Sequence, residues 1–100
     1  MSAHPRLQAA GIPWYRREHY EKLLAVFEDA TNLPRTFSDW LAKAEQIEQA
    51  MRQRGIRVVR VEIDPDRFPA WCTAHGLKVD ANGRTRYASH IARESVTTEK

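Results

Sequence analysis

A chain of 100 residues, 42% of them apolar, has the size and composition of one globular domain with one core. No apolar run approaches the roughly 18 residues that span a bilayer, and the N-terminal residues lack the continuous apolar segment of a secretory signal. The single cysteine, Cys72, excludes an internal disulfide framework and suits a reducing compartment. We therefore expect a cytoplasmic protein.

The net charge of +3 is concentrated in the C-terminal half of the chain. Residues 1–50 carry six Lys/Arg against seven Asp/Glu, whereas residues 51–100 carry ten against six. A basic half can attract nucleic acid or another polyanion. Acidic residues interrupt the basic ones, which favours a solvated, mildly basic surface. The arginines that would contact a nucleic acid are Arg54, Arg57, Arg60, Arg84 and Arg86.

The first half of the chain predicts an arm followed by two helices. Residues 1–13, with two prolines and a glycine, predict a flexible N-terminal arm. Apolar side chains at helical spacing predict a helix over residues 16–29. A second helix begins after the cap residue Thr36, with Asp39 three positions on, and ends at Gly55.

Residues 55–64, GIRVVRVEID, are the only stretch that clearly predicts a β-strand. Its side chains alternate between an apolar face with Val59, Val61 and Ile63 and a second face, suited to water, with Val58, Arg60 and Glu62. A single strand is not stable alone. Three partners are open: the arm around residues 7–12, a short later strand (LKV or RTRYA), or a second copy of the chain.

Pairing with a second copy is testable by its register. An antiparallel pair with its twofold axis at Val61 places Arg60 opposite Glu62 and Val59 opposite Ile63 of the other copy. An axis at Arg60 would instead place two arginines opposite each other, which is unfavourable. The register therefore predicts a homodimer through strand 57–63, with Val59, Arg60, Val61, Glu62 and Ile63 at the interface.

After the strand, a third, shorter helix is expected between the cap Asp64 and Gly76. Residues 80–93 favour a fourth helix, although Asn82-Gly83 leaves a hairpin as the alternative. Residues 94–100 predict a disordered tail, so the domain is assigned to residues 14–93.

The residues that can carry chemistry form no convincing active site. Cys72 and His75 share a helix face, but a buried thiol beside a helix-terminal histidine is the simpler interpretation. Glu62, Asp64 and Asp66 form an acidic group that capping and surface placement explain. No glycine-rich phosphate loop is present, and no catalytic residue, metal site or cofactor is predicted.

Four segments carry a resemblance: IPWY, TFSDWLAKAE, GIRVVRVEIDPDRFPAWC and HGL. Over residues 12–93 the chain resembles small uncharacterised bacterial proteins of about this length, a domain of unknown function. The resemblance implies a stand-alone cytoplasmic domain and no activity, substrate or catalytic residue.

These observations predict an α+β fold with three or four helices around one central strand. The expected core residues are Phe27, Trp40, Ile47, Val59, Val61, Phe68 and Trp71. The predicted function is that of a non-enzymatic module for self-association or binding another protein. The alternative is weak nucleic-acid binding through Arg54, Arg57, Arg60, Arg84 and Arg86 of the C-terminal half.

Overall fold

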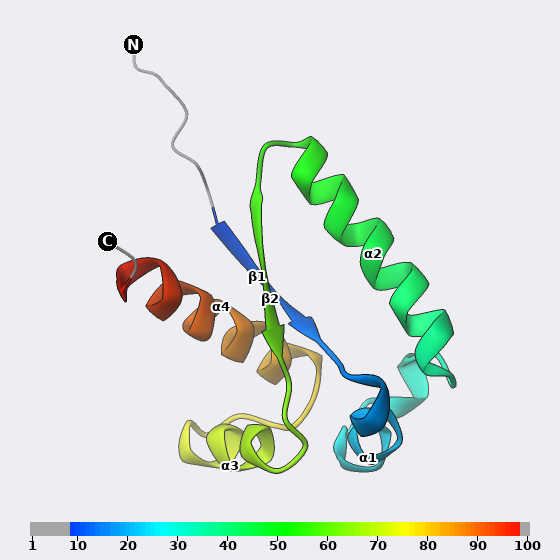
Figure 1. Ribbon diagram of the computed structural model, residues 1–100. Coiled ribbons are helices and arrows are strands. Elements are labelled where there is room, and N and C mark those ends of the chain that lie inside the picture. Colours follow the sequence, from blue (N-terminus) through cyan, green and yellow to red (C-terminus); the bar gives the residue numbers. More distant parts are fainter. Residues whose placement is uncertain (1–8, 99–100) are drawn as a thin grey trace.

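The computed structural model describes residues 9–98, which fold into two parallel strands and four α-helices (Figure 1). This is the α+β class expected from the sequence. In chain order the elements are β1 (Ala9–Trp14), the short 3-10 helix η1 (Arg17–His19), α1 (Tyr20–Val26), the 3-10 helix η2 (Ala30–Asn32), α2 (Phe37–Gln53), β2 (Arg57–Glu62), α3 (Arg67–Ala74) and α4 (Ala81–Thr98).

The predicted strand, β2, pairs with the N-terminal segment. β1 and β2 run parallel, in a register that places Ala9 beside Arg57 and Trp14 beside Glu62. Of the three partners left open, the arm is therefore the one used. The prediction of a flexible arm was wrong for residues 9–13, which form most of β1, while residues 1–8 lie outside the described residues.

Helix α4 packs closely against one face of this sheet, and a glycine permits the approach. A Cβ at Gly11 would overlap the carbonyl oxygen of Ala88 and lie 2.8 Å from the Cβ of Ala92. Ala88 and Ala92 are buried together with Val61 of β2. The missing side chain of Gly11 and two alanines on α4 thus let the helix lie directly on the strands.

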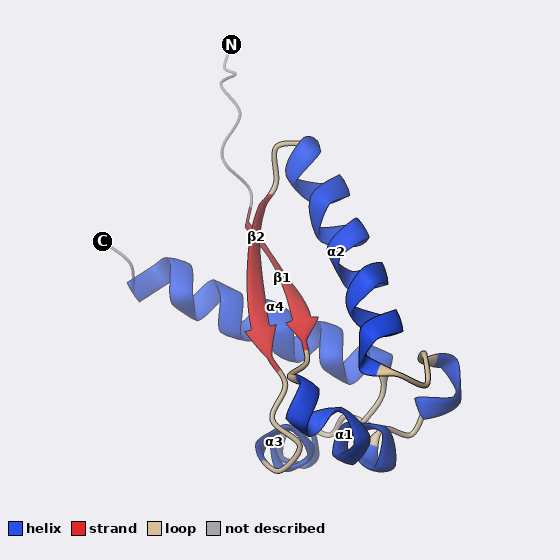
Figure 2. Cartoon of the chain, turned by 45° about the vertical axis from the view of Figure 1, so that its right-hand side comes forward, coloured by secondary structure: helices blue, strands red, loops and turns tan. Residues whose placement is uncertain are grey.

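Helix α2 lies on the other side of the sheet (Figure 2), and long side chains connect the two. The ring of Trp14 on β1 packs edge-on against Trp40 of α2, with centroids 5.1 Å apart. Arg60 of β2 stacks its guanidinium over Trp14, 3.9 Å from the ring centroid, and reaches Glu48 of α2. We expected this face to be exposed to water. It is partly covered, because Arg60 contacts both the Trp14 ring and the Glu48 carboxylate there.

The main core lies below the ends of the strands, where α1, α2 and α3 meet. Its buried residues are mostly aromatic or large apolar ones: Tyr15, Tyr20, Leu23, Phe27, Trp40, Ala44, Ile63, Phe68 and Cys72. Of the expected core residues, four are buried and two, Val59 and Trp71, are partly buried. Ile47 is 57% exposed, so that prediction was wrong: its side chain borders a hollow between α2 and the end of β1 and is left uncovered there.

The helix ends follow local side-chain chemistry. The Thr36 hydroxyl accepts a hydrogen bond from the Asp39 amide (3.1 Å), as expected for the start of α2. Asp64 accepts bonds from the Asp66 and Arg67 amides at the start of α3. The stops at Gly55 and Gly76 have φ of 83° and 68°, in the left-handed region that glycine favours.

Two helix boundaries differ from expectation. The helix predicted over residues 16–29 is interrupted: Phe27 is extended, and the Glu28 amide donates to the Val79 carbonyl oxygen (2.7 Å), a partner 51 residues away. The expected fourth helix is present as α4 in place of the hairpin; it begins at Ala81, and Asp80 accepts the Gly83 amide at its start. Helix α4 continues to Thr98, so residues 94–98 of the tail predicted as disordered are helical.

Candidate functional site

The outer edge of β2, which faces away from β1, presents main-chain hydrogen-bonding groups. The Ile63 amide donates to the Trp14 carbonyl oxygen (2.9 Å), so the peptide groups of Ile63 point toward β1. Because successive residues of a strand direct these groups to opposite edges, those of Glu62, Arg60 and Val58 point outward. Figure 2 shows no described element beside this edge.

Helix α4 extends beyond this edge. In Figures 1 and 2 its C-terminal half projects past β2, where residues 9–98 supply no further strand to lie on it. Near this part of the helix, Ile91 and Val59 are only partly buried. The outer edge of β2 and the projecting half of α4 lie next to each other in both views, and we call them together the β2 edge surface.

The side chains that were expected to cross a dimer interface are largely engaged within the chain. Arg60 donates two hydrogen bonds of 2.8 Å to the Glu48 carboxylate. Glu62 lies 3.6 Å from Arg16. Val61 and Ile63 are already 3% and 0% exposed. An interface here would accordingly depend on main-chain hydrogen bonds and α4, more than on the Arg60–Glu62 ion pair or the Val59–Ile63 contact.

The Arg60–Glu48 pair has a clear electrostatic effect. The hydrogen bonds from Arg60 and the weaker contribution of Arg52 hold the pKa of Glu48 at about 2, below its ordinary value of 4.5. Glu48 itself is a buried residue on α2. The pair therefore remains charged at neutral pH and joins the helix to β2.

The five arginines proposed for nucleic-acid binding do not form one surface. Arg84 is 6% exposed and makes two 2.8 Å bonds to Asp29, which lower the pKa of that carboxyl. Arg60 is paired with Glu48. Arg54, Arg57 and Arg86 are exposed, but the first two lie at the start of β2, whereas Arg86 lies on α4 and lines a hollow beside α3.

Cys72 and His75 do not form a reactive pair. The Cys72 thiol is fully buried, and burial raises its pKa, which disfavours the thiolate. The His75 ring stacks on Trp71 (4.1 Å between centroids), and its Nδ1 lies 2.8 Å from the Trp71 carbonyl oxygen. Within residues 9–98, no group of three or more His, Cys, Asp or Glu side chains is arranged to hold a metal ion.

Two hollows bring together residues that the sequence did not group into one site. One, of about 330 Å³, lies between α3 and α4, where Trp71, His75 and His90 meet Arg86 and Arg93. The i, i+4 spacing of Trp71 with His75 on one predicted helix was the available signal. The residues from α4 could not be assigned to the same hollow from the sequence, because α4 is separated from α3 along the chain.

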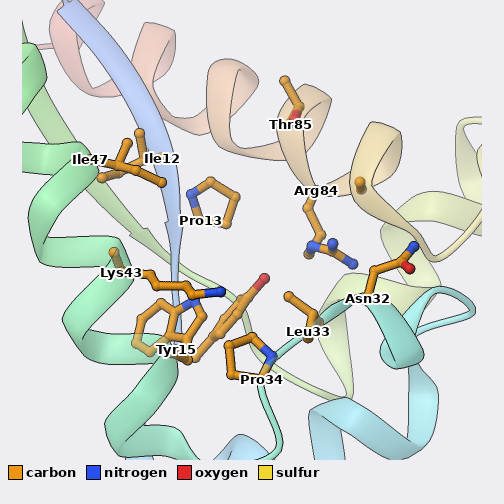
Figure 3. A pocket seen from close by; sticks show the side chains of 13 residues that line it. Ile12, Pro13, Tyr15, Asn32, Leu33, Pro34, Lys43, Ile47, Arg84 and Thr85 are labelled. Carbon is orange, nitrogen blue, oxygen red and sulfur yellow. The ribbon is translucent and has the colours of Figure 1, made fainter.

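The second hollow lies between α2, the end of β1 and the start of α4 (Figure 3). Its volume is about 350 Å³. We call it the α2–β1 groove; its apolar lining includes Ile12, Leu33, Pro34, Trp40 and Ile47. The one available signal was Ile47 itself, an apolar residue that the periodicity of α2 assigned to the core.

Searches of protein-family models, curated proteins and solved structures found no match to this chain. In the described part of the chain, none of the helices combines the length and the apolar character needed to cross a bilayer. The candidate sites therefore depend on their own geometry.

Proposed function

We propose that this protein is a small, non-enzymatic self-association module that forms a homodimer through the β2 edge surface. The observation that carries the proposal is the open outer edge of β2 beneath a helix that extends past it. A second β2 strand placed antiparallel on this edge would turn two sheets of two strands into one of four. The two projecting α4 helices would cover the same face of that sheet.

The orientation of the peptide groups supports a twofold axis at Val61. With that axis, Arg60 of one copy lies opposite Glu62 of the other, and both residues present their peptide groups to the outer edge. An axis between two adjacent residues would place outward groups opposite inward ones and form no bonds. An axis at Arg60 would bring two guanidinium groups side by side.

The expected dimer is weak. The central Arg60–Glu62 pairs contribute four main-chain hydrogen bonds of about 1 kcal/mol each, and the overhang of α4 adds apolar burial. Since the apolar face of β2 is already covered within each chain, we expect a dissociation constant of about 10–100 μM. The affinity should change little with salt, because Arg60 and Glu62 already have ionic partners within the chain.

Sedimentation equilibrium from about 5 to about 500 μM tests the proposal, with two variants of one residue. Glu62→Pro removes an outward amide and places a ring on the edge, while the Ile63 bond to Trp14 remains. Glu62→Ala loses the same carboxylate and keeps the amide. We expect dimer formation in the wild type and in Glu62→Ala, and monomers only in a folded Glu62→Pro. A wild type that stays monomeric throughout, or a Glu62→Pro that dimerises normally, contradicts it.

Nucleic-acid binding is the alternative function, and its support is the exposure of Arg54, Arg57 and Arg86. Two of the five proposed arginines, Arg60 and Arg84, are held by carboxylates of the same chain. Titration with mixed-sequence DNA or RNA tests it. Binding that weakens steeply with salt and with Arg86→Ala would favour this function over the homodimer. The single, buried cysteine supports placing either activity in the cytoplasm.

A further inference from the structure

The α2–β1 groove opens on the side of β1 opposite the β2 edge surface. Four elements form it: the end of β1, the segment that follows η2, one side of α2 and the start of α4. Its volume of about 350 Å³ falls in the range of small-molecule pockets, about 300–1,000 Å³. Ile47, 57% exposed, and Ile12 offer apolar surface at its mouth. The groove therefore has both the size and the apolar lining of a ligand site.

Tyr15 provides the second observation. The residue is 3% exposed, yet its hydroxyl makes no hydrogen bond to any described residue, and it points into the groove (Figure 3). Although the residue as a whole is buried, its hydroxyl oxygen is open to the groove, where water or a ligand can bond to it. Burial raises the pKa of Tyr15 to about 12, so the hydroxyl remains a hydrogen-bond donor at physiological pH. It can thus donate to an acceptor that enters the groove.

The charges around the groove select an anion. Figure 3 shows the amino group of Lys43 directed toward the same space as the Tyr15 hydroxyl. Lys43 makes no ion pair with a described carboxylate, and no Asp or Glu lines the groove. Arg84 also lines it, although its terminal nitrogens are engaged by Asp29. Lys43 and Tyr15 together offer two donors, one of them charged, beside an apolar wall.

We infer that the α2–β1 groove binds a small apolar carboxylic acid. Its carboxylate is held by the Lys43 ammonium and the Tyr15 hydroxyl, and its apolar body lies against Ile12 and Ile47. The two donors bind the charged form of the ligand, and the apolar wall contributes in proportion to the area it covers. This site is separate from the β2 edge surface and does not depend on the proposed dimer.

Isothermal titration with octanoate and with octylamine tests the inference, because the two probes share the apolar chain and differ in the sign of the head group. We expect octanoate to bind at least about tenfold more tightly than octylamine. Lys43→Met should abolish this preference, and Tyr15→Phe should weaken octanoate binding about threefold to tenfold. Lys22→Met, which removes an exposed lysine on α1, is the control.

The apolar wall is tested on the surface of α2. Ile47→Asp should weaken octanoate at least about tenfold, whereas Gln46→Asp, one position along the same helix, should leave it unchanged. Both residues are exposed, so both variants should fold. Equal affinity for the two probes, no binding of octanoate at millimolar concentration, or an unchanged affinity in Ile47→Asp would each overturn the inference. None of these outcomes bears on the β2 edge surface.

Discussion

Glu48 joins α2 to β2, and its replacement by glutamine tests whether this ion pair stabilises the fold. The carboxylate accepts two bonds of 2.8 Å from Arg60 and one of 3.0 Å from Arg52, and only 6% of Glu48 is exposed. Glutamine has nearly the same shape, but it offers one acceptor oxygen and no charge. One Arg60 nitrogen would then face an amide group in place of a carboxylate.

The magnitude follows from the pKa of Glu48. A change from 4.5 in the unfolded chain to about 2 in the folded one corresponds to ~3 kcal/mol. Solvent screens the pair, because the side chains of Arg60 and Arg52 are 47% and 59% exposed. We therefore expect Glu48→Gln to lower the free energy of unfolding by about 2 kcal/mol at neutral pH.

The pH dependence provides the sharper test. A carboxyl whose pKa is lowered by folding stabilises the protein fully above its unfolded pKa and loses this effect as the pH falls toward its folded pKa. The contribution of Glu48 should therefore be complete above about pH 5 and disappear between about 4.5 and about 2. In this range the stability of Glu48→Gln should depend less on pH than that of the wild type.

Urea unfolding at about pH 7 and about pH 3 measures both effects. Glu21→Gln is the control, since it removes the same charge from an exposed position on α1. The difference between wild type and Glu48→Gln should shrink from about 2 kcal/mol toward zero at the lower pH. An equal difference at both pH values would show that the ion pair does not stabilise the fold in the way described.

Two further predictions concern the backbone. Gly11→Ala should destabilise the domain by about 2 kcal/mol or more, because the new Cβ would overlap the backbone of Ala88 and push α4 off the sheet. Urea unfolding measures this change, and a loss below about 0.5 kcal/mol would contradict the packing described. Thr36→Ala should lower the free energy of unfolding by about 1 kcal/mol, because the Asp39 amide loses its cap. Thr36→Ser keeps the hydroxyl and should lower it by only a few tenths of a kcal/mol. Equal melting temperatures for the two variants would refute this role of Thr36.

The elements set by local chemistry were predictable. The Thr36 cap, the left-handed Gly55 and Gly76, and the strand at 57–62 all depend on residues within a few positions of one another. The start of the fourth helix likewise follows from Asp80, three positions before the amide that it accepts, whereas its continuation past residue 93 was not predicted. Such bonds form wherever the spacing is right, so the pattern of residues is enough to predict them.

The arm shows where this reasoning fails. Residues 9–13 carry the small residues and proline typical of a loop, yet they form a strand because Gly11 fits against Ala88 and Ala92. That fit depends on a helix more than 70 positions later, which no local pattern contains. The same applies to Phe27, where the bond from Glu28 to Val79 ends the predicted first helix.

The sequence by itself determined that this is an α+β domain, where most of its helices begin and end, and which face of β2 is apolar. Only the tertiary structure decided the direction of the β1–β2 pairing, the capture of Arg60 by Glu48 and of Arg84 by Asp29, and the exposure of Ile47 beside a groove. Caps and periodicity act over a few residues of chain. Ion pairs and burial depend on which distant segments meet, and that is settled when the whole chain packs.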